Sequence, residues 1–322
     1  MENTSGLPET LQQVILHFSN PDNVLAFAKR MRWPEGKPTC PRCQSQENSY
    51  LATRRVWECK GCRKQFSVKQ GSIFEDSPIS LDKWLIAMWM IADCKNGISS
   101  YEVSRDLAVS QKCAWFMLHR IRLAMQNGSI EKFSGPIEAD ETYVGGKAEF
   151  MHMDKRTRKL AEGKLGRGGF GKAIVFGLLD RNTKKARVKV VKTPRKGELR
   201  GEIRKHVEVG SPVYTDALKS YRGLTDDGFV HDFIDHAEAY ARGAVHTNGM
   251  ENFWSLFKRS LKGTYVSVEP YHLQAYADEQ AFRFNNRKIT SLDRFLAVAS
   301  GVTGRRITFD ELTGKGLDQV TS

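Results

Sequence analysis

Hydrophobic residues recur every three or four positions in several stretches of the chain, and this spacing predicts helices. The stretches are residues 11–18, 23–31, 80–97, 98–125, 197–207, 246–263 and 271–287. After residue 136, short apolar runs bounded by glycine or polar residues predict strands instead. The runs are residues 136–146, 173–180, 186–192, 211–216 and 229–236. Because strands and helices mix in this part, we expect an α/β domain there and a mainly helical region before it.

The helical stretch at 98–125 is interpreted as two helices with a break near residue 109. Ser99 and Glu102 have the spacing of a capping box at its start. The unit resembles a helix-turn-helix, whose second helix would begin near Ser110 and could enter a DNA major groove. Candidate DNA-binding residues on that helix are Gln111, Lys112 and Arg120. A plain helical hairpin is the alternative.

Four cysteines are arranged as two CxxC pairs. Cys40 and Cys43 form the first pair, and Cys59 and Cys62 form the second, with a hairpin-length segment between them. Four thiolates at this spacing are typical of a structural zinc ion in a zinc ribbon. A redox motif would not need two pairs, and iron is the other metal that such a site accepts. The ribbon is rich in arginine and lysine, so it could bind DNA or simply hold the N-terminal region together.

The composition narrows the class of partner. The chain of 322 residues carries 50 Lys+Arg against 37 Asp+Glu, a net charge of +13. A protein this basic usually meets a polyanion, and we expect double-stranded DNA. The longest apolar run, residues 84–92, is far shorter than a membrane span, and the N-terminus lacks the pattern of a signal peptide. We therefore expect no membrane partner and a cytoplasmic, nucleoid-associated protein.

Three carboxylates stand where a divalent-metal site could form. Asp140 and Asp216 lie at the predicted ends of strands, and Glu251 lies on the polar face of the 246–263 helix. Acids in this arrangement can share two cations for phosphoryl transfer, and Mg²⁺ suits oxygen ligands. Each acid also has a simpler explanation in a turn or cap, and Asn248 with Glu251 has capping-box spacing. Glu138 and Glu141 flank Asp140, and we expect both on the opposite face of the strand.

Several segments together resemble one family. They are "RWPEGKPTCPRC", "GISSYEVSRDLAVSQKCAWFMLHRIRLAM", "IEADETYVGGK", "VYTDALKSY", "HTNGMENFWSLFKRSLKGTY" and "YHLQAYADEQAFRFNNR". They resemble the DDE transposases of bacterial insertion sequences, in the group with an N-terminal zinc ribbon to which the eukaryotic Merlin elements are related. The resemblance covers almost the whole chain in order. It implies an RNase H-like catalytic domain that cuts and joins the terminal inverted repeats of its element.

The resemblance also implies roles for individual residues. Asp140, Asp216 and Glu251 would bind two Mg²⁺ or Mn²⁺ ions, and Lys258 matches the basic residue seven positions after the glutamate. Some relatives use an asparagine as third ligand, so Asn248 competes with Glu251. We prefer Glu251 because a carboxylate neutralises metal charge better. Lys258, Arg259 and Lys262 would contact DNA phosphates.

The predicted fold is therefore α/β, with an RNase H-like mixed sheet flanked by helices. It is preceded by a zinc ribbon with one zinc ion and by the helix-turn-helix-like region. The expected divisions are residues 1–36 (helical), 37–70 (ribbon), 71–130 (DNA-binding helices), 136–300 (catalytic) and 301–322 (tail). A basic, glycine-rich loop at 147–172 is expected to contact DNA.

Transposition joins two element ends to one target, so we expect a homodimer or larger assembly. A nuclease or resolvase of the same fold, which cuts without joining, is one alternative function. A domesticated zinc-ribbon regulator that binds DNA without catalysis is the other.

Overall fold

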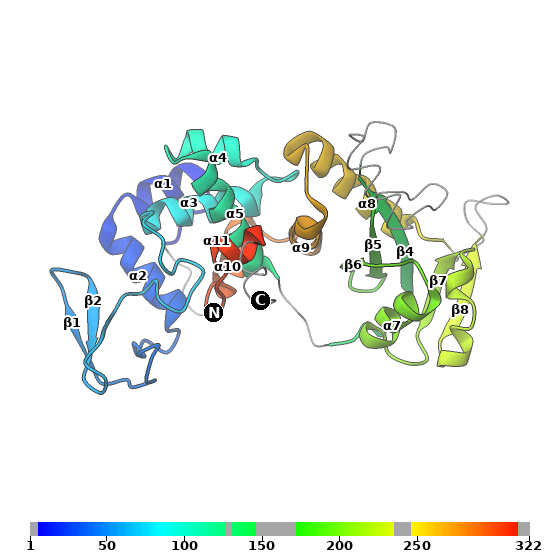
Figure 1. Cartoon of the computed structure of the whole chain (residues 1–322), viewed down its shortest axis with the longest axis horizontal. Helices are drawn as coiled ribbons and strands as arrows, with labels where there is room; N and C mark the ends of the chain where they lie inside the picture. Colours follow the sequence, from blue (N-terminus) through cyan, green and yellow to red (C-terminus); the bar gives the residue numbers. More distant parts are fainter. Residues whose placement is uncertain (1–5, 127–130, 146–171, 235–245, 315–322) are drawn as a thin grey trace, which may run out of the picture. The chain divides into compact units, whose positions relative to one another are not determined.

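The computed structural model describes residues 6–126, 131–145, 172–234 and 246–314. The chain divides into two compact units, one formed by residues 1–127 with 288–322 and the other by residues 128–287. Figure 1 shows the helices and strands of both units.

The first unit is mainly helical in its described residues. Its helices are α1 (Leu11–Phe18), α2 (Pro21–Arg32), α3 (Leu81–Asp93), α4 (Ser100–Asp106), α5 (Gln111–Met125), α10 (Ser291–Ser300) and α11 (Phe309–Thr313). The capping box predicted for Ser99 and Glu102 is confirmed, with both reciprocal hydrogen bonds formed. Ser80 is the N-cap residue of α3, although its side chain makes no capping hydrogen bond.

Helix α10 belongs to this first unit, although the sequence pattern placed residues up to 300 in the catalytic domain. The Phe295 ring stacks on Phe27 of α2 at 5.3 Å and packs against Trp89 of α3 at 5.6 Å. Arg294 adds an ion pair with Asp93 at 2.5 Å. The division therefore falls near residue 288, because α10 buries its apolar face against helices from the other end of the chain.

The ribbon is a small antiparallel sheet in the first unit. Its strands are β1 (Asn48–Leu51), β2 (Val56–Cys59) and β3 (Gln65–Phe66), in that spatial order. Trp57 and Phe66 pack with Trp33, which ends helix α2, at ring distances of 4.8 and 6.2 Å. The ribbon thus shares an aromatic core with the N-terminal helices.

The second unit is built on a mixed five-stranded sheet. Its strands are β4 (Ile137–Val144), β5 (Ala173–Asp180), β6 (Lys185–Val191), β7 (Pro212–Asp216) and β8 (Val230–Ile234). The spatial order is β6-β5-β4-β7-β8, with antiparallel pairing from β6 to β4 and parallel pairing from β4 to β8. This is the mixed sheet expected for an RNase H-like domain, and Figure 1 shows the helices that flank it.

Each face of the sheet carries its own apolar cluster. On one face, α7 (Lys196–His206) packs through Leu199 and Ile203 on Ile137 and Ala139 of β4. Short 3₁₀ turns at Lys219–Tyr221 (η2) and Thr225–Asp227 (η3) follow β7. The other face is covered by α8 (Asn248–Ser260) and α9 (Leu273–Asn285). Alternation along β4 therefore directs odd-numbered residues to α7 and even-numbered residues to α8.

Helix α8 leads into a π-helical turn, η4 (Leu261–Tyr265), and a 3₁₀ turn, η5 (Pro270–His272), precedes α9. A buried polar group holds α8 and this turn on α9. Ser260 donates to Gln280 at 3.3 Å, and the Tyr265 hydroxyl donates to Glu279, which also pairs with Arg283. Among the described residues, no helix is long and apolar enough to span a membrane.

Candidate functional site

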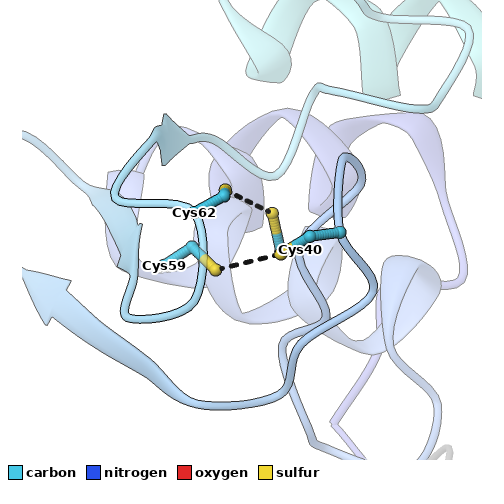
Figure 2. A group of neighbouring side chains, drawn as sticks. Cys40, Cys59 and Cys62 are labelled. Atoms are coloured by element: carbon cyan, nitrogen blue, oxygen red, sulfur yellow. Dashed lines mark hydrogen bonds between the residues drawn. The ribbon is translucent and has the colours of Figure 1, made fainter.

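The four cysteines of the ribbon converge on one point. The Sγ atoms of Cys40 and Cys62 are 3.7 Å apart, and those of Cys43 and Cys59 are 3.4 Å apart. All four sulfurs lie within 4.8 Å of one another, and Figure 2 shows Cys40, Cys59 and Cys62 pointing toward each other. Ligands placed tetrahedrally at about 2.3 Å from a zinc ion would be roughly 3.8 Å apart, so the spacing fits zinc.

Two matching turns present these sulfurs. The Gln44 N–H donates to the Cys40 carbonyl at 3.0 Å, and the Arg63 N–H donates to the Cys59 carbonyl at 2.9 Å. The backbone N–H of Cys62 holds the pKa of the Cys59 thiol down to about 7, so its thiolate forms near neutral pH. None of the cysteines in the described residues forms a disulfide, which leaves all four thiols as potential metal ligands.

Helix α5 is largely a core helix rather than an exposed recognition helix. The prediction that Arg120 binds DNA is wrong for this structure, because its side chain is buried. The guanidinium donates to the backbone carbonyls of Ile73, Glu75 and Ile307 at 2.6 to 3.1 Å. Arg120 therefore holds three segments of the first unit together.

The first turn of α5 is more open. Lys112 is exposed, and its Nζ lies 4.5 Å over the Phe309 ring. Gln111 is half-buried and donates to the Ser100 hydroxyl at 2.9 Å. The N-terminal turn is the part of a recognition helix that reaches base edges, so Lys112 and Gln111 remain candidates for DNA contact.

Asp140 and Asp216 lie on neighbouring parallel strands. Glu138 of β4 pairs with Tyr214 of β7, so two residues further on Asp140 and Asp216 stand side by side. Asp216 ends β7 as expected, whereas β4 continues past Asp140 to Val144. The Leu218 N–H donates to Asp216 Oδ1 at 3.0 Å, and Trp254 Nε1 of α8 donates to Asp140 Oδ2 at 2.9 Å. The chain reversal after β7 and helix α8 thus each orient one carboxylate.

The negative charge of Glu251 affects Asp140, one member of this pair. Burial raises the pKa of Asp140 to about 6, repulsion from Asp216 and Glu251 adds to the rise, and the Trp254 hydrogen bond opposes it. Three carboxylates that repel one another at neutral pH would be stabilised by bound cations. Among the described residues, the donor atoms that all lie within 4.8 Å of one another are those of the four cysteines. The carboxylates of the acid group are accordingly spread farther apart than the sulfurs of the cysteine cluster.

The alternative explanation of Glu251 as a capping residue does not hold. The N-cap of α8 is Thr247, so Asn248 is the first helical residue and cannot form a capping box with Glu251. The Thr247 hydroxyl instead donates to Glu251 Oε1 at 3.4 Å. Asn248 and Glu251 are both exposed in the first turn of the helix. Their side chains are therefore accessible to an incoming ligand.

The acids that flank Asp140 separate onto different faces. The expectation that both lie opposite Asp140 is wrong for Glu138, which is two residues away and so shares the α8 face. Glu138 accepts from the Met250 N–H at 2.9 Å. Glu141 lies on the α7 side, where the buried Tyr221 hydroxyl donates to its Oε2 at 2.5 Å. Burial raises the pKa of Glu141 to about 7, with contributions from Asp216 and Asp140.

The basic residues of α8 are solvent-accessible. Lys258 and Arg259 are exposed in its last turn, and Lys262 is exposed in the following π-helical turn. The basic loop predicted at 147–172 lies outside the described residues, except for Lys172 at its end.

Comparison with known proteins gives a match for most of the second unit and for the ribbon region of the first unit. Residues 132–285 match the ISXO2-like transposase domain, and residues 20–65 match the transposase zinc-ribbon domain. The chain belongs to the insertion-sequence transposases with an N-terminal zinc ribbon. It is also similar to an uncharacterized protein in the transposable element ISH50 of Halobacterium salinarum. That relative is 29% identical over 246 residues, which cover 74% of this chain and 81% of the relative.

The matched segments place the two candidate centres of this transposase in different domains. The four cysteines lie in the zinc-ribbon match, and this membership favours zinc over iron as their metal. Asp140, Asp216 and Glu251 lie in the transposase match. The sequence pattern missed Trp254 as the partner of Asp140 and Tyr221 as the partner of Glu141, and it missed the contact of Glu138 with helix α8. Correct alternation along β4 could have placed Glu138 beside Asp140, but the other two contacts depend on tertiary packing.

Proposed function

We propose that this transposase binds the terminal inverted repeats of an insertion sequence, cuts at their ends and joins them to target DNA. The observation that carries the proposal is the grouping of Asp140 and Asp216 on adjacent parallel strands, with Glu251 close enough to raise the pKa of Asp140. Repulsion between neighbouring carboxylates destabilises the folded protein when no ligand is bound. Divalent cations are the ligands that neutralise this repulsion.

Asp140, Asp216 and Glu251 would hold two Mg²⁺ or Mn²⁺ ions, which supply activation of the attacking oxygen and stabilisation of the leaving oxygen. Asn248, one turn earlier on the same helix, is the alternative third ligand. Glu251 is preferred because a carboxylate neutralises the charge of the metal better than an amide does. Trp254 fixes Asp140 by its hydrogen bond, so the carboxylate does not have to reorganise when the substrate arrives.

The exposed basic side chains would bind the DNA backbone. Lys258, Arg259 and Lys262 would neutralise phosphates near the acids, since the helical rise places Lys258 about 10 Å beyond Glu251. Lys112 and Gln111, with the basic zinc ribbon, would bind the terminal repeats. One zinc ion per chain would hold the ribbon. Two ends must meet one target, so a dimer or larger assembly would carry out the reaction.

The test uses the full-length protein and DNA that contains both ends of its own element, taken from the sequence that flanks the gene. We expect Mg²⁺-dependent cutting at the ends and joining to a target plasmid. Asp216→Ala should abolish both reactions while end binding persists.

Three outcomes would contradict the proposal. Normal cutting by Asp216→Ala would refute the assignment of the acids. Cutting without joining would identify a nuclease instead. End binding by the wild-type protein without any cutting would favour a regulator.

A further inference from the structure

Glu138 is a buried acid with no part in the metal site just proposed. Its side chain is 2% exposed, and it lies on the α8 face of β4, two residues before Asp140. Oε1 accepts from Arg181 Nε at 2.7 Å and lies 3.5 Å from His246 Nδ1. Oε2 accepts from the Met250 N–H at 2.9 Å. Since donors already occupy both oxygens, Glu138 is suited to holding protein groups rather than a cation.

Arg181 extends these contacts to strand β7. It follows β5, and its Nη2 donates to the His246 carbonyl at 2.6 Å and lies 2.8 Å from His246 Nδ1. Its guanidinium stacks over the Tyr214 ring of β7 at 4.5 Å. Glu138, Arg181, His246 and the Met250 N–H, here termed the Glu138 cluster, therefore join β4, β5 and β7 to the start of α8.

Two glycines let α8 approach the sheet at this point. A Cβ on Gly249 would lie 2.8 Å from Glu138 Oε2. A Cβ on Gly177, which pairs with Asp140 across the sheet, would lie 2.2 Å from Met250 Cε and 2.8 Å from Trp254 Cζ2. The first two turns of α8 thus depend on close contact with β4, which carries Glu138, and with β5, which carries Gly177.

We infer that Glu138 and Arg181 are positioning residues that fix the first turn of α8 on β4, and so place Glu251 and Asn248 relative to Asp140. The inference rests on the proposed function of these acids. A carboxylate at a helix N-terminus satisfies one of the backbone N–H groups that the helix leaves unpaired, and it interacts favourably with the helix dipole. Arg181 compensates the buried charge, which would otherwise be costly.

Glu138→Gln in the full-length protein tests the inference. Glutamine keeps the shape of the side chain. Its amide, however, lacks the two anionic oxygens with which Glu138 accepts hydrogen bonds from Arg181 and the Met250 N–H. We expect the Mg²⁺ concentration for half-maximal cutting to rise about 10- to 100-fold, as for other residues that support metal ligands. Terminal-repeat binding should stay unchanged. Hydrogen exchange should become faster in the peptide that contains Met250, and Mn²⁺ binding measured by paramagnetic resonance should weaken in parallel.

Asp227→Asn is the matched control. Asp227 pairs with Arg200 at 2.5 Å, with side-chain exposures of 11% and 10%, on the α7 side of the sheet. The Asp227→Asn substitution removes a comparable buried ion pair. It should leave the Mg²⁺ concentration for half-maximal cutting unchanged. If Glu138→Gln does not fold, Gly249→Ala disturbs the same contact without changing a charge, and it should shift the metal dependence in the same direction.

Unchanged metal dependence and unchanged exchange at Met250 in the folded variant would overturn the inference. An equal shift in Asp227→Asn would also overturn it, because the effect would then reflect stability alone. A wild-type protein that cuts no DNA would refute the proposed function instead. Exchange at Met250 and Mn²⁺ binding would still test the Glu138 cluster in that case.

Discussion

The cysteine cluster and the acid group of this transposase differ in where their residues come from. The cysteines lie between Cys40 and Cys62 on two similar turns, whereas the acids lie on β4, β7 and α8 between Asp140 and Glu251. The cysteine sulfurs come within 4.8 Å of one another, as a closed structural site requires. The acids are more open, and Glu251 is exposed. Local spacing brings the cysteines together, whereas long-range packing brings the acids together.

The largest expected effect is loss of folding in the first unit. Cys59→Ser removes a buried thiolate ligand, and structural zinc contributes about 10 kcal/mol or more of apparent folding free energy. The aromatic core around Trp57 and Trp33 should then disorder. Circular dichroism in the near ultraviolet should lose the part of the tryptophan signal that comes from Trp33 and Trp57, and zinc analysis should fall from one per chain toward zero. Full retention of zinc by Cys59→Ser would contradict the four-cysteine site.

Asp140→Asn should have the opposite pattern, with activity lost and stability gained. Loss of an ion ligand costs several kcal/mol of transition-state stabilisation, which corresponds to a fall in cutting of about 10³-fold or more. Without added Mg²⁺, the variant should be more stable by about 1 to 3 kcal/mol, because folding raises the pKa of Asp140 from 3.8 to about 6.

The change in the stability of the protein with pH follows from the raised pKa of Asp140. The folded protein favours the protonated form of Asp140. The free-energy cost of burying its ionised carboxylate is therefore absent below pH 3.8 and complete above about pH 6. Thermal unfolding at pH 7 should show the stabilisation of Asp140→Asn. A destabilised variant would indicate that Asp140 is a structural residue.

Gly177→Ala should affect both stability and cutting by a smaller amount. The added methyl group meets Met250 and Trp254 beneath α8, and overpacking of this kind costs about 1 to 3 kcal/mol. Cutting should fall because α8 carries Glu251. Gly201→Ala is the matched control, since a Cβ there meets nothing within 4 Å in helix α7 and should stabilise by up to about 1 kcal/mol. Urea unfolding and end cutting would measure both variants.

Lys262→Ala should have the smallest effect. Lys262 is exposed in the π-helical turn after α8, and its loss should weaken end binding without changing which sequence is bound. The slope of log affinity against log salt should become smaller by about 1, as for one phosphate contact. An unchanged slope would remove Lys262 from the DNA contacts.

Local patterns in the sequence were enough for much of this structure. The run "AIVFGLLD" coincides with β5, and the capping box at Ser99 forms as predicted. The two CxxC pairs specify the cysteine cluster because both the ligands and the turns that present them are local. All five strands of the mixed sheet and its flanking helices were located for the same reason, since their apolar periodicity reports burial.

Tertiary contacts account for what the sequence could not predict. Arg120 has the position of a DNA-reading residue, but carbonyls from distant segments satisfy it in the core. Helix α10 pairs with Phe27, a partner from the far end of the chain that no local pattern indicates. Thr247 rather than Asn248 holds the N-cap position of α8, and Glu138 of β4 accepts from the Met250 N–H in its first turn, a contact that no local pattern indicates.

We propose that Asp140 and Asp216 contact the metal during cutting, whereas the cysteines only hold the ribbon. The most direct measurement is end cutting by Asp216→Cys in Mg²⁺ and in Mn²⁺. Sulfur is a poor ligand for the hard Mg²⁺ ion and a better one for Mn²⁺. The variant should be inactive in Mg²⁺ and regain part of its activity in Mn²⁺, while Asp216→Ala stays inactive in both. Equal activity of Asp216→Cys in the two metals, or rescue of Asp216→Ala by Mn²⁺, would contradict direct contact between Asp216 and the ion.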